Sequence, residues 1–117
     1  MAKIKVHAGD FYNGEHNYSF GNFSLRNENN RWLGETIPAS EIDEIDKASE
    51  ESIKKIGGTI GWGATGAVLL GPAGLLAGLL LGGRKKEVTF AAKFKDGRKI
   101  LATTDQKTYT NILSKCF

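Results

Sequence analysis

The segment EVTFAAKFKDGRKILATT, Glu87–Thr104, decides the fold expected for this chain. Apolar and polar residues alternate along Glu87–Lys95, which predicts a strand with inward-facing Val88, Phe90, Ala92 and Phe94. Asp96–Gly97 is the strongest hairpin signal in the sequence, because both residues tolerate the positive φ of a tight turn. The alternation resumes in Arg98–Thr104, with Ile100 and Ala102 on one face. The segment therefore predicts an antiparallel β-hairpin.

Further strands are expected in the first forty residues. Ile4 and Val6 alternate with lysines. The run Tyr18–Leu25 predicts inward side chains and a slip near Gly21–Asn22 that is either a bulge or a turn; the inward residues are Tyr18, Phe20, Phe23 and Leu25. Another strand contains Trp32, Leu33 and Ile37, and Pro38 marks an edge position or the end of that strand.

A short helix is expected at the C-terminal end of the sequence. Asp105 has the character of an N-cap, because its carboxylate can accept a hydrogen bond from a free N–H of the first helical turn. Apolar residues then recur with helical spacing at Tyr109, Ile112, Leu113 and Cys116. One face of this helix should pack on the sheet.

The segment Glu41–Ile56 allows two interpretations. Its apolar residues lie near helical spacing after Ser40, a possible N-cap, which favours one amphipathic helix. Alternatively, Glu41 to about Lys47 is a strand and the helix starts at Ser49. We prefer the second interpretation because of a family resemblance.

The stretches IPASEIDEI, Ile37–Ile45, and FAAKFKDGR, Phe90–Arg98, resemble bacterial pleckstrin-homology-like domains. The run GPAGLLAG, Gly71–Gly78, is similar to inserts that interrupt such domains in small bacterial proteins. The resemblance implies an α+β fold, mainly an antiparallel β-roll or split barrel with a C-terminal capping helix, and no catalytic residues. We expect one domain over residues 1–117, with a β region at 1–47, an insert at 57–83, and a β-hairpin plus helix at 87–117.

The insert, GGTIGWGATGAVLLGPAGLLAGLLLGG, contains no charged residue between Gly57 and Gly83. A straight helix of this length would extend about 40 Å, enough to cross a hydrocarbon core of about 30 Å. Gly71–Pro72 lies at its centre, however, and should interrupt a helix there. We therefore expect a helical hairpin with arms at about Gly58–Leu70 and Ala73–Leu81.

Glycines and leucines give this hairpin its expected role. Gly74, Gly78 and Gly82 repeat every four residues, so a second helix can approach closely. The leucines exceed what a small domain with a β core can bury, and leaving five in water at about 2 kcal/mol each would rival the net stability of a domain. We expect contact with a membrane, or self-association, through Leu69, Leu70, Gly74, Leu75, Leu76, Gly78, Leu79, Leu80 and Gly82. The alternative is that the hairpin folds back over the sheet.

Positive charge brackets this insert. The net charge is +3, but residues 1–83 carry 7 Lys/Arg against 10 Asp/Glu, whereas residues 84–117 carry 9 against 3. Positive flanks at both ends favour the same side of a membrane. The residues expected to contact anionic lipid are Lys54, Lys55, Arg84, Lys85 and Lys86. We do not expect nucleic acid as a partner, because Phe90 and Phe94 should face inward.

A second set of charges lies just before the insert. The acidic residues form either a solvated face or a docking surface for another protein; they are Glu41, Asp43, Glu44, Asp46, Glu50 and Glu51. The alternative function is therefore a soluble inhibitor or immunity-type protein that binds its partner through this face or through a sheet edge.

Several kinds of site are not expected. The single cysteine, Cys116, precludes an intramolecular disulfide, and the spacing of His7 and His16 does not bring metal ligands together. No nucleophile with a base nearby is recognisable, so we expect no enzyme and no cofactor. The N-terminal residues lack the apolar run of a secretory signal. We expect a cytoplasmic protein, or one peripheral on the inner face of the membrane, which acts as a non-enzymatic interaction module.

Overall fold

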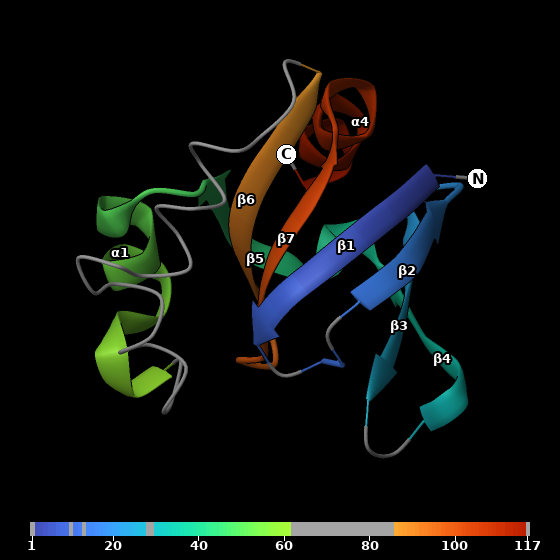
Figure 1. The fold of residues 1–117 in the computed structure, drawn as a ribbon, viewed down its shortest axis with the longest axis horizontal. Coiled ribbons are helices and arrows are strands. Elements are labelled where there is room, and N and C mark those ends of the chain that lie inside the picture. Colours follow the sequence, from blue (N-terminus) through green and yellow to red (C-terminus); the bar gives the residue numbers. More distant parts are fainter. Residues whose placement is uncertain (1, 10, 13, 28–29, 62–85, 117) are drawn as a thin grey trace.

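The computed structural model describes residues 2–9, 11–12, 14–27, 30–61 and 86–116 (Figure 1). A run of strands comes first, then a helix, a second pair of strands and a final helix. The elements are β1 (Ala2–Gly9), β2 (Gly14–Ser19), β3 (Asn22–Asn27), β4 (Asn30–Pro38), the 3-10 turn η1 (Ala39–Glu41), β5 (Ile42–Lys47), α1 (Glu50–Gly61), β6 (Glu87–Phe94), β7 (Lys99–Asp105) and α4 (Gln106–Cys116).

The strands form one curled antiparallel sheet in the order β4-β3-β2-β1-β7-β6-β5. Strands that are consecutive in sequence pair with each other, except β4 and β5, which η1 connects although they lie at opposite ends of the sheet order. The remaining pair joins β1 to β7. The expected α+β class, mainly antiparallel, is confirmed, as is the hairpin at Asp96–Gly97. Strands near both ends of the chain thus meet at the centre of the sheet.

The core lies inside the curled sheet, because the sheet turns one face of every strand inward. Phe23, Phe90 and Phe94 are fully or almost fully buried, and the rings of Phe23 and Phe94 meet edge to face with centroids 5.8 Å apart. Ile4, Val6, Leu25, Ile100 and Ala102 belong to the same cluster. The alternation expected for β1, β6 and β7 is confirmed, because its inward positions are the ones buried here.

Helix α4 covers one end of this core, with Tyr109 and Ile112 buried. Its expected N-cap is confirmed: the Asp105 carboxylate accepts hydrogen bonds from the Thr108 N–H at 3.1 Å and from the Thr108 hydroxyl. These bonds lower the pKa of Asp105. The Tyr18 hydroxyl donates to Asn111 Oδ1 at 2.7 Å, so α4 is joined to β2 as well as packed on the core.

The structure decides between the two interpretations of Glu41–Ile56. Ile42–Lys47 is strand β5, paired with β6, and α1 follows at Glu50. The boundary is fixed by a reciprocal cap in which the Ser52 N–H donates to Ser49 Oγ at 3.0 Å and the Ser49 N–H donates to Ser52 Oγ at 2.8 Å. The preferred interpretation, a strand and then a helix starting at Ser49, is confirmed.

Helix α1 packs on the outer face of the sheet against β5 and β6. Its Ile53 and Ile56 are buried, and Ala91 of β6 and Leu101 of β7 are buried although they point away from the inner core. The β6–β7 region therefore has apolar packing on both faces, which explains why Leu101 is apolar although it lies opposite Ile100 and Ala102.

The inward position predicted for Phe20 is wrong. Its side chain is 100% exposed, and Phe20 and Gly21 have φ of 52° and 78° as the two central residues of the β2–β3 hairpin. Positive φ at both central positions is the mark of a type I′ turn. The slip near Gly21–Asn22 is thus a turn, and it ends the alternation one residue before Phe20.

Most of the expected hairpin lies outside the described residues. This applies to both arms beyond Gly61, to all nine leucines and glycines proposed for membrane contact or self-association, and to Arg84 and Lys85. Gly57–Gly61 belongs to the last turns of α1. Within the part of the chain that the structure describes, no helix is both long and apolar enough to cross a membrane.

Candidate interaction site

The described lysines that flank the insert occupy two separate places. Lys54 and Lys55 are exposed on α1, whereas Lys86 is exposed at the start of β6. The Lys86 carbonyl accepts a hydrogen bond of 2.9 Å from the N–H of Gln106, the first residue of α4. Because α1 and α4 lie on different sides of β6 (Figure 1), the structure does not join these lysines in one patch.

The acidic residues are only partly available for a partner. Lys93 Nζ lies 3.8 Å from Asp43 Oδ2 and 3.6 Å from Glu44 Oε1, so two of the six acids have a partner on the neighbouring strand. Asp46 accepts a hydrogen bond of 2.8 Å from the N–H of Lys47. Glu41 and Glu51 are exposed, and the side chain of Glu50 is outside the described residues. The expected acidic face is therefore partly neutralised.

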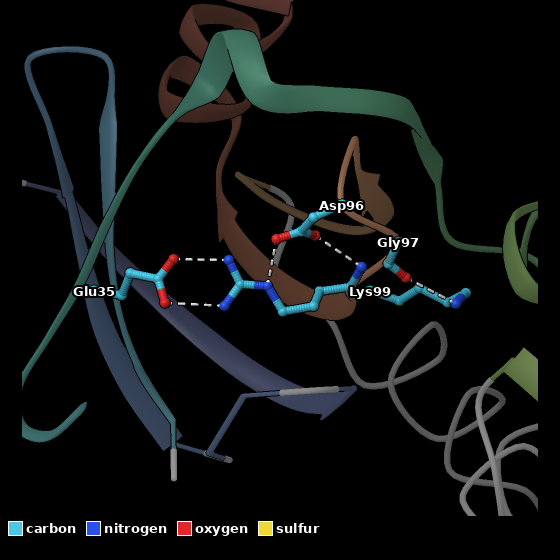
Figure 2. A network of polar contacts seen from close by, with 5 residues as sticks. Glu35, Asp96, Gly97 and Lys99 are labelled. Atoms are coloured by element: carbon cyan, nitrogen blue, oxygen red, sulfur yellow. Dashed lines mark hydrogen bonds and ion pairs between the residues drawn. The ribbon is translucent and has the colours of Figure 1, made fainter. Parts of the chain in front are cut away.

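Arg98 is the centre of a polar cluster that the sequence analysis missed (Figure 2). Its guanidinium donates to both carboxylate oxygens of Glu35, at 3.0 and 2.7 Å, and its Nε donates to Asp96 Oδ2 at 2.7 Å. The guanidinium carbon also lies 5.0 Å from the centroid of the Phe11 ring. These hydrogen bonds raise the pKa of Arg98, so the residue stays charged.

This cluster connects distant parts of the sheet. Glu35 belongs to β4 at one end of the strand order, and Arg98 follows the turn between β6 and β7. The two carboxylates take three of the five N–H donors and offset the charge of the guanidinium, and the Phe11 ring covers one of its faces, so an external anion would have to compete with them. We therefore assign Arg98 to holding the curled sheet together.

The two histidines lie on opposite faces of the sheet. His7 Nε2 is 2.8 Å from Thr103 Oγ1, which is in turn 2.7 Å from Thr89 Oγ1, so a polar row crosses β1, β7 and β6. His16 pairs with Ile4 and faces inward. Burial lowers the pKa of both. Among the described residues, no three His, Cys, Asp or Glu side chains are placed to hold a metal ion.

The remaining candidate surface surrounds Phe20, at the end of the sheet covered by α4. A groove of about 520 Å³ lies between the β2–β3 turn and α4, and its lining includes Ala2, Tyr18, Phe20, Lys107, Thr108 and Asn111. The stem of Lys115 passes the same turn, since a Cβ on Gly21 would lie 3.6 Å from Lys115 Cε. Sequence reasoning missed this surface because Phe20 was expected in the core.

Comparisons of the chain with protein-family models, with curated proteins and with solved structures find no match.

Proposed function

We propose that the chain is a non-enzymatic interaction module of the pleckstrin-homology-like type, which associates with an anionic membrane surface through its glycine-rich apolar insert. Self-association through the same insert is the other outcome that its leucines allow. Two lines of support come from the arrangement of the sheet and from the apolar content of the insert.

The strand order supports the family assignment. A four-stranded meander, β1 to β4, is followed by β5 to β7, β7 returns to pair with β1, and a C-terminal helix covers one end of the core. This arrangement is consistent with the split barrel and capping helix that the resemblance of Ile37–Ile45 and Phe90–Arg98 implies.

One observation carries the function. The inner core is a continuous cluster built from the strands and α4, with Phe23, Phe90 and Phe94 among its members. The insert adds seven leucines from Leu69 to Leu81, in a segment without charged residues, to the apolar content of the chain. Such a segment needs an apolar environment, and a bilayer would supply one, with Lys54 and Lys55 on α1 and the separate Lys86 exposed to anionic headgroups.

Vesicle flotation tests the proposal. The full chain should float with vesicles that contain phosphatidylglycerol, float less with pure phosphatidylcholine, and lose binding as salt rises. The double variant Leu76→Asp, Leu80→Asp should stay in the soluble fraction, whereas Lys95→Glu, at an exposed lysine on the β6–β7 turn, serves as control. Full flotation of the Asp variant would contradict the proposal, and light scattering with and without detergent would show whether copies associate instead.

A second candidate function rests on the position of β5. It is the last strand in the sheet order, it carries the exposed Asp46, and the exposed Glu41 directly precedes it, so a partner protein could add a strand or contact the acids there. A detergent-free monomer that does not float, and whose complex with one defined protein is lost on Asp46→Lys, would favour this function.

A further inference from the structure

Phe20 is presented to solvent by a rigid part of the fold. The Gly21 carbonyl accepts a hydrogen bond of 2.8 Å from the N–H of Ala39, and Asn22 pairs with Pro38 on β4. Asn22 Nδ2 donates to the Phe20 carbonyl at 3.3 Å. The turn is held from both sides, so the full exposure of the ring follows from the fold and not from a loose loop.

The residue type at this turn conflicts with local stability. A non-glycine residue at positive φ is disfavoured, and asparagine is the usual choice at the first central position of a type I′ turn. Here a large aromatic side chain takes that position and buries nothing. Local conflicts of this kind gather at functional sites.

A second conflict lies on the adjacent helix. Lys107 is in the first turn of α4, where the helix dipole favours acidic residues, and α4 contains no acidic residue. The exposed side of α4 therefore carries two lysines and otherwise uncharged polar residues; it consists of Gln106, Lys107, Thr110, Asn111, Ser114 and Lys115. Lys107 lines the groove beside Phe20 and Lys115 flanks the turn.

This surface extends to Lys86, the first described residue after the insert. Lys107 also lines a second hollow with Lys86 and Asp105, and Lys86 is held against the start of α4 by the hydrogen bond from Gln106 to the Lys86 carbonyl. A protruding aromatic ring flanked by Lys107 and Lys115, on a surface that extends to Lys86, has the chemistry that a bilayer with anionic headgroups complements.

We propose that Phe20, Lys107 and Lys115 form a second contact with the anionic lipid surface, in which the ring enters the interfacial region and the lysines meet phosphate groups. The inference rests on the proposed membrane association, and it specifies which end of the fold would face the membrane. An acidic protein surface is the competing occupant.

Substitution of Phe20 separates this contact from folding. Phe20→Asn should weaken partition onto phosphatidylglycerol vesicles by about tenfold, since it removes the aromatic side chain that the bilayer would bury. Its melting temperature should equal or exceed that of the wild type, because asparagine suits the turn. Phe20→Trp should retain binding, since tryptophan favours the interface. Lys107→Glu, Lys115→Glu should weaken binding at low salt, with Lys47→Glu, Lys95→Glu as the matched control.

The outcomes distinguish the two proposals. Flotation of the wild type with unchanged flotation of Phe20→Asn and of Lys107→Glu, Lys115→Glu overturns this inference and leaves the proposed function standing. If Phe20→Asn loses flotation but the double variant Leu76→Asp, Leu80→Asp keeps it, this inference is supported and the role of the insert is overturned. A wild type that remains soluble with every vesicle overturns both.

Discussion

His16 has an uncommon environment for an ionisable side chain. It is 3% exposed, its Nδ1 lies 3.1 Å from the Gly14 carbonyl oxygen, and its Nε2 has no hydrogen-bond partner among the described residues. Burial lowers its pKa below the ordinary value of 6.5, the bond to Gly14 opposes the shift, and Arg26 adds to it. The neutral imidazole is therefore the form that the fold accepts.

The fold should consequently lose stability in mild acid. Because the pKa of His16 is lowered in the folded state, the unfolded chain binds more protons as pH falls below 6.5. The stability that the neutral His16 allows is therefore complete above that pH and is lost as pH falls. The free energy of unfolding in urea should decrease from pH 7.5 to pH 5, and less so in His16→Gln. Burial also lowers the pKa of His7, and the variant His7→Gln measures how much of the pH dependence comes from that residue. Equal pH dependence in His16→Gln and the wild type would show that His16 is not responsible.

Removal of the Arg98 guanidinium should reduce the stability of the fold. Its side chain is 30% exposed and Glu35 is 34% exposed, so solvent screens the pair only in part. Arg98→Met should cost about 1–3 kcal/mol of unfolding free energy, because it removes three charge-assisted hydrogen bonds from the guanidinium to Glu35 and Asp96. Arg98→Lys should recover little of this, since an ammonium cannot donate to both Glu35 oxygens in the same plane. Lys95→Met should change stability by less than about 0.5 kcal/mol.

At the scale of the element, the boundary between β5 and α1 depends on two serines. Ser49→Ala removes the oxygen that accepts from the Ser52 N–H and should cost about 1 kcal/mol in urea unfolding. Ser40→Ala is the matched control, because Ser40 is exposed and would have been the cap only if one helix ran from Glu41. A larger loss for Ser40→Ala would contradict the assigned start of α1.

Local patterns predicted most of the strands. The alternation predicted the buried faces of β1, β6 and β7, and Asp96–Gly97 predicted the turn between β6 and β7. Both signals act between residues that are neighbours in the sequence. Phe20 was misplaced since a bulge and a two-residue turn differ only in the backbone of Phe20 and Gly21, and phenylalanine is not a usual residue for such a turn. The partners Glu35 and Arg98, 63 residues apart, depend on the curl of the whole sheet, which no local pattern encodes.

For the whole molecule, the central question is whether the insert is part of the core. Among the described residues, the strands and α4 supply most of the inner cluster, so we expect a variant with residues 62–85 replaced by a glycine–serine linker to unfold cooperatively. Circular dichroism should retain the strand signal, and the variant should no longer float with anionic vesicles. An unfolded or aggregated variant would instead support the alternative that the hairpin folds back over the sheet and completes the core.

The pairing of β1 with β7 also governs the order of events during synthesis. The Thr104 hydroxyl donates to the Lys3 carbonyl across 101 positions of sequence, so the pair β1–β7 at the centre of the sheet forms only after β7 has left the ribosome. By then the uncharged segment before β6 has already emerged. The most apolar segment of the sequence is therefore synthesised before the central strand pair of the sheet can form.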